Sequence, residues 1–277
     1  MRERAVLRAR ACHARSVTID GFEAREARAF GAFDARAADR AYGWVDRVAR
    51  RFGVEVDGIE RLPEGRALVV GNHTFGWDVT FPMAAVWRTR RRPLWALGEH
   101  AWWAVPFVRR IVAAVGTVDG TPENVDRLLS AGELVLVLPG GLREAVKPRE
   151  LRYQLLWGRR YGFVRAAIRN RAPIVPLACI GADDLFDFVG NAYERGARWL
   201  GRPGFPIPFP TRMLPIPRRS RFRFVFGEPI ETGAEPAQCD DPKVLRRVRH
   251  EVAGALHELI ENELARRAGI DVGADDA

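Results

Sequence analysis

Short apolar segments bounded by turn residues alternate along the chain with longer segments of helical character. Five apolar runs have the length and composition of buried strands, at 67–70, 94–97, 134–138, 174–180 and 221–226. Between them, helix-like segments lie at roughly 79–91, 101–114, 122–131 and 156–170. This alternation is typical of α/β proteins, in which helices cover a sheet. It predicts an α/β sandwich around a mixed, largely buried central sheet.

Two further helices are expected at the ends of this pattern. Apolar residues recur at three- and four-residue steps across 33–52, and the last helix begins at Asp241-Pro242 and ends before Gly269, about seven turns later. We expect an N-terminal arm and amphipathic helix at 1–52, one main domain at 53–268 and a disordered tail at 269–277. Six prolines make 203–217 an apolar loop.

Composition limits which partners the chain is expected to bind and in which compartment it is expected to work. A formal charge of +9 indicates an anionic partner, such as a phosphate-bearing molecule, a lipid surface or nucleic acid. The three cysteines are widely spaced and suggest neither a disulfide framework nor a zinc cluster, so a cytoplasmic setting is expected. No stretch reaches the roughly 18 uncharged apolar residues of a spanning helix. The chain is expected to lie on a membrane rather than cross it.

A histidine and an aspartate follow the first apolar run in the segment GNHTFGWD. His73 and Asp78 are five positions apart, which on a continuous helix would point the two side chains about 140° apart. We therefore expect a turn within 73–77, with Gly76 as its pivot. A histidine whose tautomer is fixed by a carboxylate can act as a general base near neutral pH. The alternative is a hydrogen-bonded structural histidine at a strand–helix junction.

A glycine pair follows the very apolar run LVLVL. Gly140 and Gly141 could bring backbone N–H groups close to a phosphate or an oxyanion, and Arg143 and Glu144 come directly after them. An ordinary glycine turn is the alternative. Residues 143–171 hold nine basic residues against two acidic ones. This excess could bind coenzyme A phosphates or anionic headgroups, or be a solvated helix face.

Four motifs in order resemble the glycerolipid acyltransferase family, also called the PlsC-type or lysophospholipid acyltransferase family. NHTFGWD matches its His-x4-Asp signature, and the other three blocks correspond to Gly116-Thr117-Val118, to LPGGLRE and to APIVPLACIG. PGGLREA followed by WGRRYGF looks most like the diacylglycerol-acyltransferase-like branch. The third block departs from the phosphatidate-forming pattern, because Gly140 stands where that pattern has Glu and Leu142 where it has Thr.

The resemblance implies an O-acyltransferase that moves a fatty acyl group from acyl-CoA or acyl carrier protein to a lipid hydroxyl. His73 and Asp78 would be catalytic, and Gly116, Thr117 and the third-block residues Gly140, Gly141, Arg143 and Glu144 would bind substrate. No cofactor, metal or nucleic acid is implied. A neutral glycerolipid or lipid alcohol is the expected acceptor, with lysophosphatidate or another lysophospholipid as the alternative.

Several rival functions are less consistent with the residues. None of the three serines lies in a G-x-S-x-G elbow, which argues against a serine hydrolase. Cys179 lies inside an apolar run, as a buried hydrophobe rather than a nucleophile. A metal hydrolase would need ligands beyond His73, and His100 is the one nearby candidate. The non-enzyme rival is a basic lipid- or nucleic-acid-binding module, although the sequence has no recognisable RNA- or DNA-binding motif.

Two apolar segments are expected to contact the membrane, at its inner face. The first holds Trp102, Trp103, Val105 and Phe107, and the second is the proline-rich loop around Phe205, Phe209, Met213 and Leu214. The alternative is that these side chains line the core or an acyl tunnel.

Overall fold

The computed structural model describes residues 33–74, 77–98, 100–103, 105–184 and 222–269. Seven strands form one sheet in the order β1-β7-β6-β2-β5-β3-β4. They are β1 (Glu55–Asp57), β2 (Ala67–Gly71), β3 (Leu94–Gly98), β4 (Thr117–Asp119), β5 (Leu134–Val137), β6 (Ile174–Ile180) and β7 (Arg223–Phe226). The strands from β6 to β4 are mutually parallel, whereas β7 is antiparallel to β6 and carries β1 with it.

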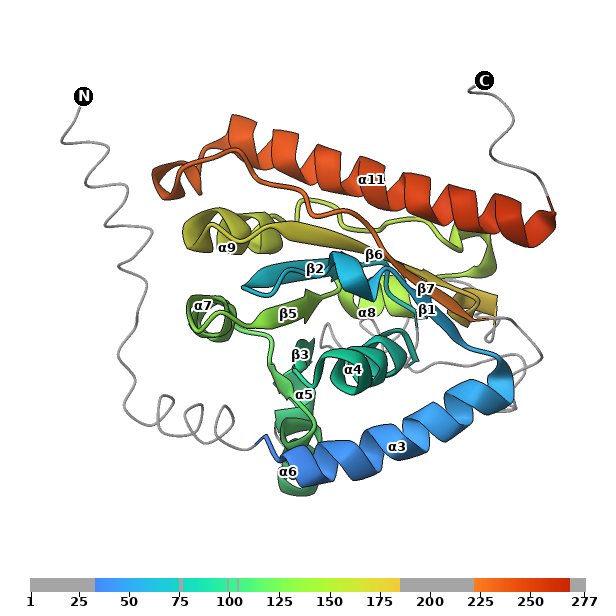
Figure 1. Cartoon of the computed structure of the whole chain (residues 1–277). Helices are drawn as coiled ribbons and strands as arrows, with labels where there is room; N and C mark the ends of the chain where they lie inside the picture. Colours follow the sequence, from blue (N-terminus) through green and yellow to red (C-terminus); the bar gives the residue numbers. More distant parts are fainter. Residues whose placement is uncertain (1–32, 75–76, 99, 104, 185–221, 270–277) are drawn as a thin grey trace, which may run out of the picture.

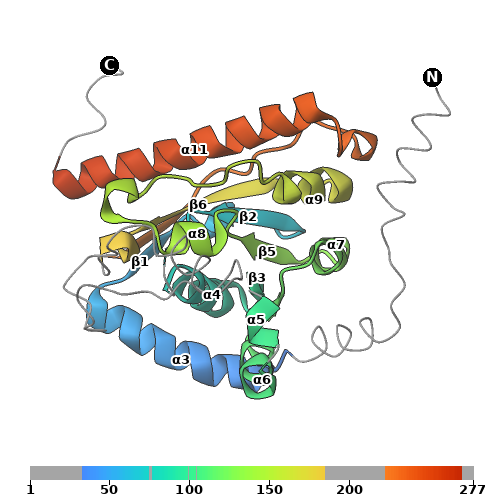
Figure 2. The same cartoon turned by 180° about the vertical axis from the view of Figure 1, so that it is seen from behind.

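Helices cover both faces of this sheet (Figures 1 and 2). One layer holds α7 (Pro122–Ser130), α9 (Gly162–Asn170) and α11 (Pro242–Ala268), and the other holds α4 (Trp77–Arg90) with α3 (Ala35–Phe52) packed outside it. The short helices α5 (His100–Trp103) and α6 (Pro106–Ala114) adjoin the end of α3, and α8 (Gly141–Ala145) follows β5. The expected α/β sandwich with an N-terminal helix is confirmed.

Two apolar cores explain why the layers hold together. On the side of α9 and α11, Leu128, Ile168, Val248 and Leu256 pack against the sheet and are fully buried. On the opposite side, residues of α3 and α4 such as Val86 pack against the other face of the same strands. The central strands are therefore buried on both faces, which is why they read as continuous apolar runs in the sequence.

The structure differs from the sequence expectation at four places. Strands β1 and β4 were not predicted, because each is only three residues long and lies at an edge of the sheet. The expected helix at 101–114 is two helices, with Pro106 at the first position of α6. The expected helix at 156–170 begins only at Gly162, after a turn in which Gly158 has a φ of 52°.

The parallel strands bring the sequence motifs to one edge of the sheet. The segments that contain His73, the glycine pair and Asp183 follow the carboxyl ends of β2, β5 and β6, which are neighbours in the sheet. Open parallel sheets bind their ligands at this edge. In Figure 2, α8 lies there between the layer of α9 and α11 and the layer of α4. No helix in the described ranges is long and apolar enough to span a membrane.

Candidate active site

His73 and Asp78 are in direct contact at the carboxyl edge of the sheet. The Nδ1 atom of His73 lies 2.5 Å from Oδ2 of Asp78, and the backbone N–H of Thr74 donates to the same oxygen at 2.7 Å. Asp78 is in the first turn of α4 and is fully buried, whereas 18% of the His73 side chain is exposed. The expected turn therefore brings the pair together, although its expected pivot, Gly76, lies outside the described residues.

This contact sets the chemistry of the imidazole. With a proton on Nδ1 donated to Asp78, Nε2 is the nitrogen that can accept a proton from a substrate. Burial lowers the pKa of His73, but the charge of Asp78, its hydrogen bond and the charge of Glu144 outweigh burial, so the pKa lies above its ordinary value of 6.5. The arrangement can therefore act as a general base of raised basicity.

Glu144 holds the backbone beside His73. Its Oε1 accepts the N–H of His73 at 2.7 Å, and its Oε2 accepts the N–H of Leu156 at 2.7 Å. The side chain is fully buried, and burial raises the pKa of this carboxyl group despite the nearby positive charge of Lys147. This arrangement does not support the expected role in substrate binding, because both oxygens are occupied and no part of the residue reaches solvent.

Lys147 was not recognised in the sequence as part of the site. Its ammonium group donates to the carbonyl oxygen of His73 at 2.9 Å and lies 2.9 Å from Oδ2 of Asp183. Both the Lys147 and the Asp183 side chains are buried. Lysines are usually exposed, so the sequence gives little sign that Lys147 is buried. The one sign is its position three residues after Glu144, a spacing that places two side chains on the same side of a helical turn.

The glycine pair is explained by packing. At Gly140 the backbone is right-handed helical, but a Cβ would lie 2.1 Å from Oε2 and 2.4 Å from Cδ of Glu144. Glu144 therefore fills the space that a side chain at position 140 would need. Gly141 has a φ of 54°, and its N–H donates to the carbonyl oxygen of Leu138 at 3.0 Å, so that N–H is already used within the turn.

The remaining predicted binding residues are placed differently. Arg143 is exposed on α8, and its role stays a prediction. Thr117 is in register with Val69, four residues before His73, and β4 lies three strand positions from β2. At about 4.8 Å per strand this is about 14 Å across the sheet. The structure therefore does not bring Gly116 and Thr117 to the His73–Asp78 pair.

The basic residues of 143–171 do not form one free patch. Several are paired within the fold: Arg165 with Asp240 at 2.8 Å, Arg169 with Asp126 at 2.8 Å and Arg171 with Glu235 at 2.9 Å. Their charges are therefore partly compensated by carboxylates. The exposed members of the set that remain as candidates for binding an anionic group are Arg143, Arg149, Arg159 and Arg160, of which Arg160 also donates to the carbonyl oxygen of Pro139 at 2.7 Å.

Asn72 and Cys179 fix the end of β2 to β6. The side-chain amide of Asn72 donates to the carbonyl oxygen of Cys179 at 2.9 Å and accepts the N–H of Cys179 at 2.7 Å. Cys179 is a free, fully buried thiol, and burial raises its pKa well above the ordinary value, which argues against a nucleophilic role.

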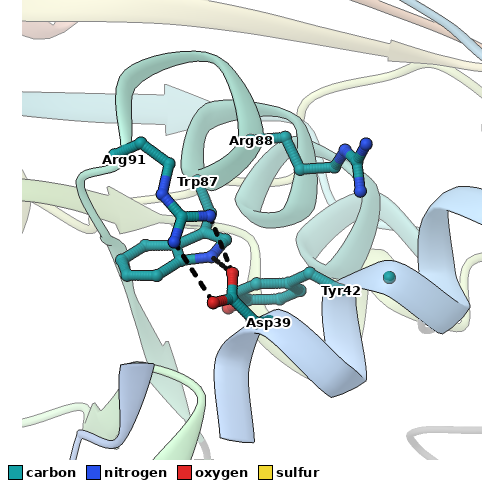
Figure 3. A pocket seen from close by; sticks show the side chains of 6 residues that line it. Asp39, Tyr42, Trp87, Arg88 and Arg91 are labelled. Carbon is teal, nitrogen blue, oxygen red and sulfur yellow. Dashed lines mark hydrogen bonds and ion pairs between the residues drawn. The ribbon is translucent and has the colours of Figure 1, made fainter. Parts of the chain in front are cut away.

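A surface pocket of about 170 Å³ lies between α3 and α4 (Figure 3). Its lining residues are Asp39, Tyr42, Gly43, Trp87, Arg88 and Arg91. Hydrogen bonds from Arg91 at 2.7 Å and from Trp87 at 2.9 Å lower the pKa of Asp39 to about 2. Trp87 follows Asp78 by nine residues of α4, about 13 Å along the helix axis. The pocket is therefore separate from the His73 site.

The described ranges contain no cluster of metal ligands at His73. Within them, no group of three His, Cys, Asp or Glu side chains is placed to hold a metal ion. His100 pairs with Asp119, the last residue of β4, at 2.6 Å. At the carboxyl edge of the sheet, His73 and Asp78 have the contact that a His–Asp general base would need.

Comparison with known proteins finds a match to a family model. Residues 53–180, which contain His73, Asp78 and α8, match the model described as Acyltransferase. The same range holds the strands from β1 to β6 and the carboxyl edge of the parallel part of the sheet. Over this range the chain is therefore similar to a family of acyltransferases.

Individual relatives cover much of the chain. It is 34% identical over 234 residues to an uncharacterized protein of Mycobacterium tuberculosis, covering 80% of this chain and 64% of that protein, so it spans less than two thirds of that relative's length. It is 28% identical over 239 residues to the mouse protein named DGAT1/2-independent enzyme synthesizing storage lipids, covering 86% of this chain and 68% of the mouse protein. The crystal structure of the 1-acyl-sn-glycerophosphate acyltransferase PlsC from Thermotoga maritima has a TM-score of 0.49 at 17% identity, over 92% of this chain and 87% of that one.

Proposed function

We propose that the chain transfers a fatty acyl group from acyl-CoA or acyl carrier protein to the hydroxyl of a neutral lipid, with His73 as general base and Asp78 as its orienting partner. The contact of 2.5 Å between the two side chains is the observation that carries the proposal. The family match supports acyl transfer as the reaction. The mouse relative's name, which refers to the synthesis of storage lipids, supports a glycerolipid acceptor.

The proposed step is a direct transfer. Nε2 of His73 takes the proton of the acceptor hydroxyl while its oxygen attacks the thioester carbonyl carbon. Asp78 stabilises the imidazolium that forms. When the tetrahedral intermediate collapses, the carbon–sulfur bond breaks and the imidazolium returns the proton to the leaving thiolate. The products are an ester and a free thiol, and no cofactor is required.

The charge around His73 supports a neutral acceptor. Among the described residues, the carboxylates of Asp78, Glu144 and Asp183 surround the site, and Lys147 is the one ammonium group between them. That ammonium is buried and already bound to Asp183 and to the His73 carbonyl. An acceptor phosphate placed directly against these groups would find no free cation among them, which favours an acceptor without a phosphate.

Contact with a membrane surface is proposed at α6. Val105, Phe107 and Ile111 are 48%, 73% and 51% exposed, and the last two lie one helical turn apart on the same face. Exposed apolar side chains on a short amphipathic helix can insert into the headgroup region. Trp103 is only partly exposed and the side chain of Trp102 is outside the described residues, as is the proline-rich loop.

Liposome co-sedimentation tests this surface. Phe107→Asp and Ile111→Asp together should reduce binding to vesicles of phosphatidylcholine and phosphatidylglycerol, because two charges replace the inserting side chains. Asn262→Asp, an exposed change on α11 in the opposite layer, is the control for added negative charge. Equal binding of all three proteins would contradict membrane contact through α6.

The proposed reaction is tested with purified protein, acyl-CoA or acyl carrier protein thioesters and a mixed acceptor panel. The panel holds mono- and diacylglycerol, a long-chain alcohol, glycerol 3-phosphate and lysophosphatidate, and mass spectrometry identifies the product. We expect acylation of neutral acceptors that is absent in His73→Ala. Acylation of lysophosphatidate alone would overturn the acceptor assignment. Lipid binding without any product would instead support a non-catalytic lipid-binding module.

A further inference from the structure

We infer that Lys147 is a positioning residue for His73, held in place by Asp183. The inference rests on the proposed role of His73 as general base. Lys147 comes directly after Val146, the residue that caps the C-terminal end of α8. Its ammonium group reaches back to the carbonyl oxygen of His73 at 2.9 Å and to Oδ2 of Asp183 at 2.9 Å.

Two side chains hold the backbone of His73, one through its N–H and the other through its carbonyl oxygen. The N–H of His73 is held by Glu144 at 2.7 Å and its carbonyl oxygen by Lys147. These two backbone groups would otherwise be free just beyond the end of β2, where sheet hydrogen bonding stops at Gly71. Together the two side chains fix the peptide planes before and after the residue, and hence the direction in which the imidazole leaves the backbone.

Asp183 prevents the Lys147 side chain from moving. It lies in the turn Ala182–Asp184, which begins two residues after the last residue of β6, and its Oδ2 also accepts the N–H of Tyr153 at 2.7 Å. Asp183 therefore ties together α8, the end of β6 and the loop that contains Tyr153. A buried ammonium group with two fixed acceptors has one available geometry, which makes it suited to hold a third element in place.

Lys147 also acts on His73 through its charge. Among the described residues, the charged groups that face the imidazole are Asp78 from α4, Glu144 from α8 and Lys147 just after α8. Of these three, only Lys147 lowers the pKa of His73. Loss of the ammonium group should therefore raise the pKa of the imidazole. A lysine that served only to neutralise Asp183 would not be required for the orientation of His73, so the two roles can be separated.

A double variant separates them. Lys147→Met alone leaves the Asp183 carboxylate buried without its cation and is expected to destabilise the protein. In Lys147→Met/Asp183→Asn the charges of both partners are removed, and the amide oxygen that replaces the carboxylate can still accept the N–H of Tyr153. Melting temperature should therefore recover in the double variant. The contact with the His73 carbonyl does not recover in either variant.

We expect the double variant to lose turnover by about 10- to 100-fold, as for other residues that orient a functional histidine, with KM for acyl-CoA unchanged. The acidic limb of its kcat/KM profile should move to higher pH. Lys243→Met is the matched control, because Lys243 is the only other lysine of the chain and is exposed on the first turn of α11.

Asp183→Asn alone provides a second comparison if the double variant does not fold. It keeps Lys147 and an acceptor for it, so it should keep most of its turnover, whereas Lys147→Met should not. Recovery of wild-type turnover and pH profile in the double variant, or equal losses in Asp183→Asn and Lys147→Met, would overturn the inference. Wild-type turnover in His73→Ala would instead overturn the proposed function on which the inference rests.

Discussion

Gly140→Ala is expected to disturb the site without adding a polar group or straining the backbone. Gly140 has φ −65° and ψ −26°, which alanine adopts freely. The new Cβ would lie 2.1 Å from Oε2, 2.3 Å from Cβ and 2.4 Å from Cδ of Glu144. Glu144 must therefore move by about 1 Å or more to reach ordinary contact distance, and its hydrogen bonds to His73 and Leu156 must lengthen or break.

The magnitude follows from these contacts. Overpacking in a buried site costs about 1–3 kcal/mol, and each hydrogen bond to a charged group contributes about 1.5–3 kcal/mol. If the clash and the loss of one of the two hydrogen bonds are both counted, Gly140→Ala should lower the free energy of unfolding by about 2.5–6 kcal/mol. Displacement of the His73 backbone should also lower turnover, by up to about 100-fold for a shift on the order of 1 Å.

A double-mutant cycle with Glu144→Gly isolates the cause. Glycine removes the whole Glu144 side chain, including the Cβ that would lie 2.3 Å from the new methyl group, so Gly140→Ala should cost much less in that background. The coupling energy should thus exceed the 0.5 kcal/mol or so within which independent mutations add. Urea unfolding followed by circular dichroism measures the four proteins. Equal costs of Gly140→Ala in both backgrounds would show that Glu144 does not fill the space beside Gly140.

Gly141→Ala is the companion control at the neighbouring position. Its left-handed φ of 54° should cost about 1–2 kcal/mol of stability in alanine. The nearest side-chain atom to the new Cβ is the flexible end of Arg160 at 2.8 Å, not Glu144. Turnover should therefore change much less than in Gly140→Ala.

Three further changes test separate parts of the account. Asp78→Asn should lower turnover by up to about 10⁴-fold, because it allows the wrong tautomer of His73. Because Asp78 raises the pKa of His73, the acidic limb of the kcat/KM profile should also move to lower pH, and an acidic limb that does not move would refute the pairing. Asn72→Ala should reduce unfolding free energy by about 2–6 kcal/mol, since it leaves the N–H and carbonyl of Cys179 unsatisfied, and urea titration would detect this. Asp39→Asn, in the pocket between α3 and α4, should leave turnover unchanged in the same assay; a large loss would connect that pocket to the reaction.

The elements with strong local signals could be predicted from the sequence. β2, β5 and β6 are buried on both faces and appear as unbroken apolar runs, and α11 has a capping aspartate and proline at its start and Gly269 at its end. The contact of His73 with Asp78 follows from their spacing once a strand–turn–helix junction is assumed. These features depend on residues that are near one another in the chain.

The support around His73 could not be predicted in the same way. Lys147 and Asp183 are far apart in sequence and meet only because β5 and β6 flank β2 in the sheet. A single lysine or aspartate carries no local sign that it will be buried, since both are usually exposed. The glycine at 140 likewise gives no sign by itself that Glu144 occupies the adjacent space. Strand order, rather than local pattern, assembles this part of the site.

The central claim is that His73 is the base for acyl transfer, and His73→Ala tests it most directly. The bonds to Glu144 and Lys147 use the backbone of His73 and are available to alanine, so the variant should fold with nearly wild-type melting behaviour. Single-turnover transfer from acyl-CoA to diacylglycerol, followed by mass spectrometry, should slow by at least about 10²- to 10⁴-fold. A folded His73→Ala protein that transfers the acyl group at the wild-type rate would contradict the account.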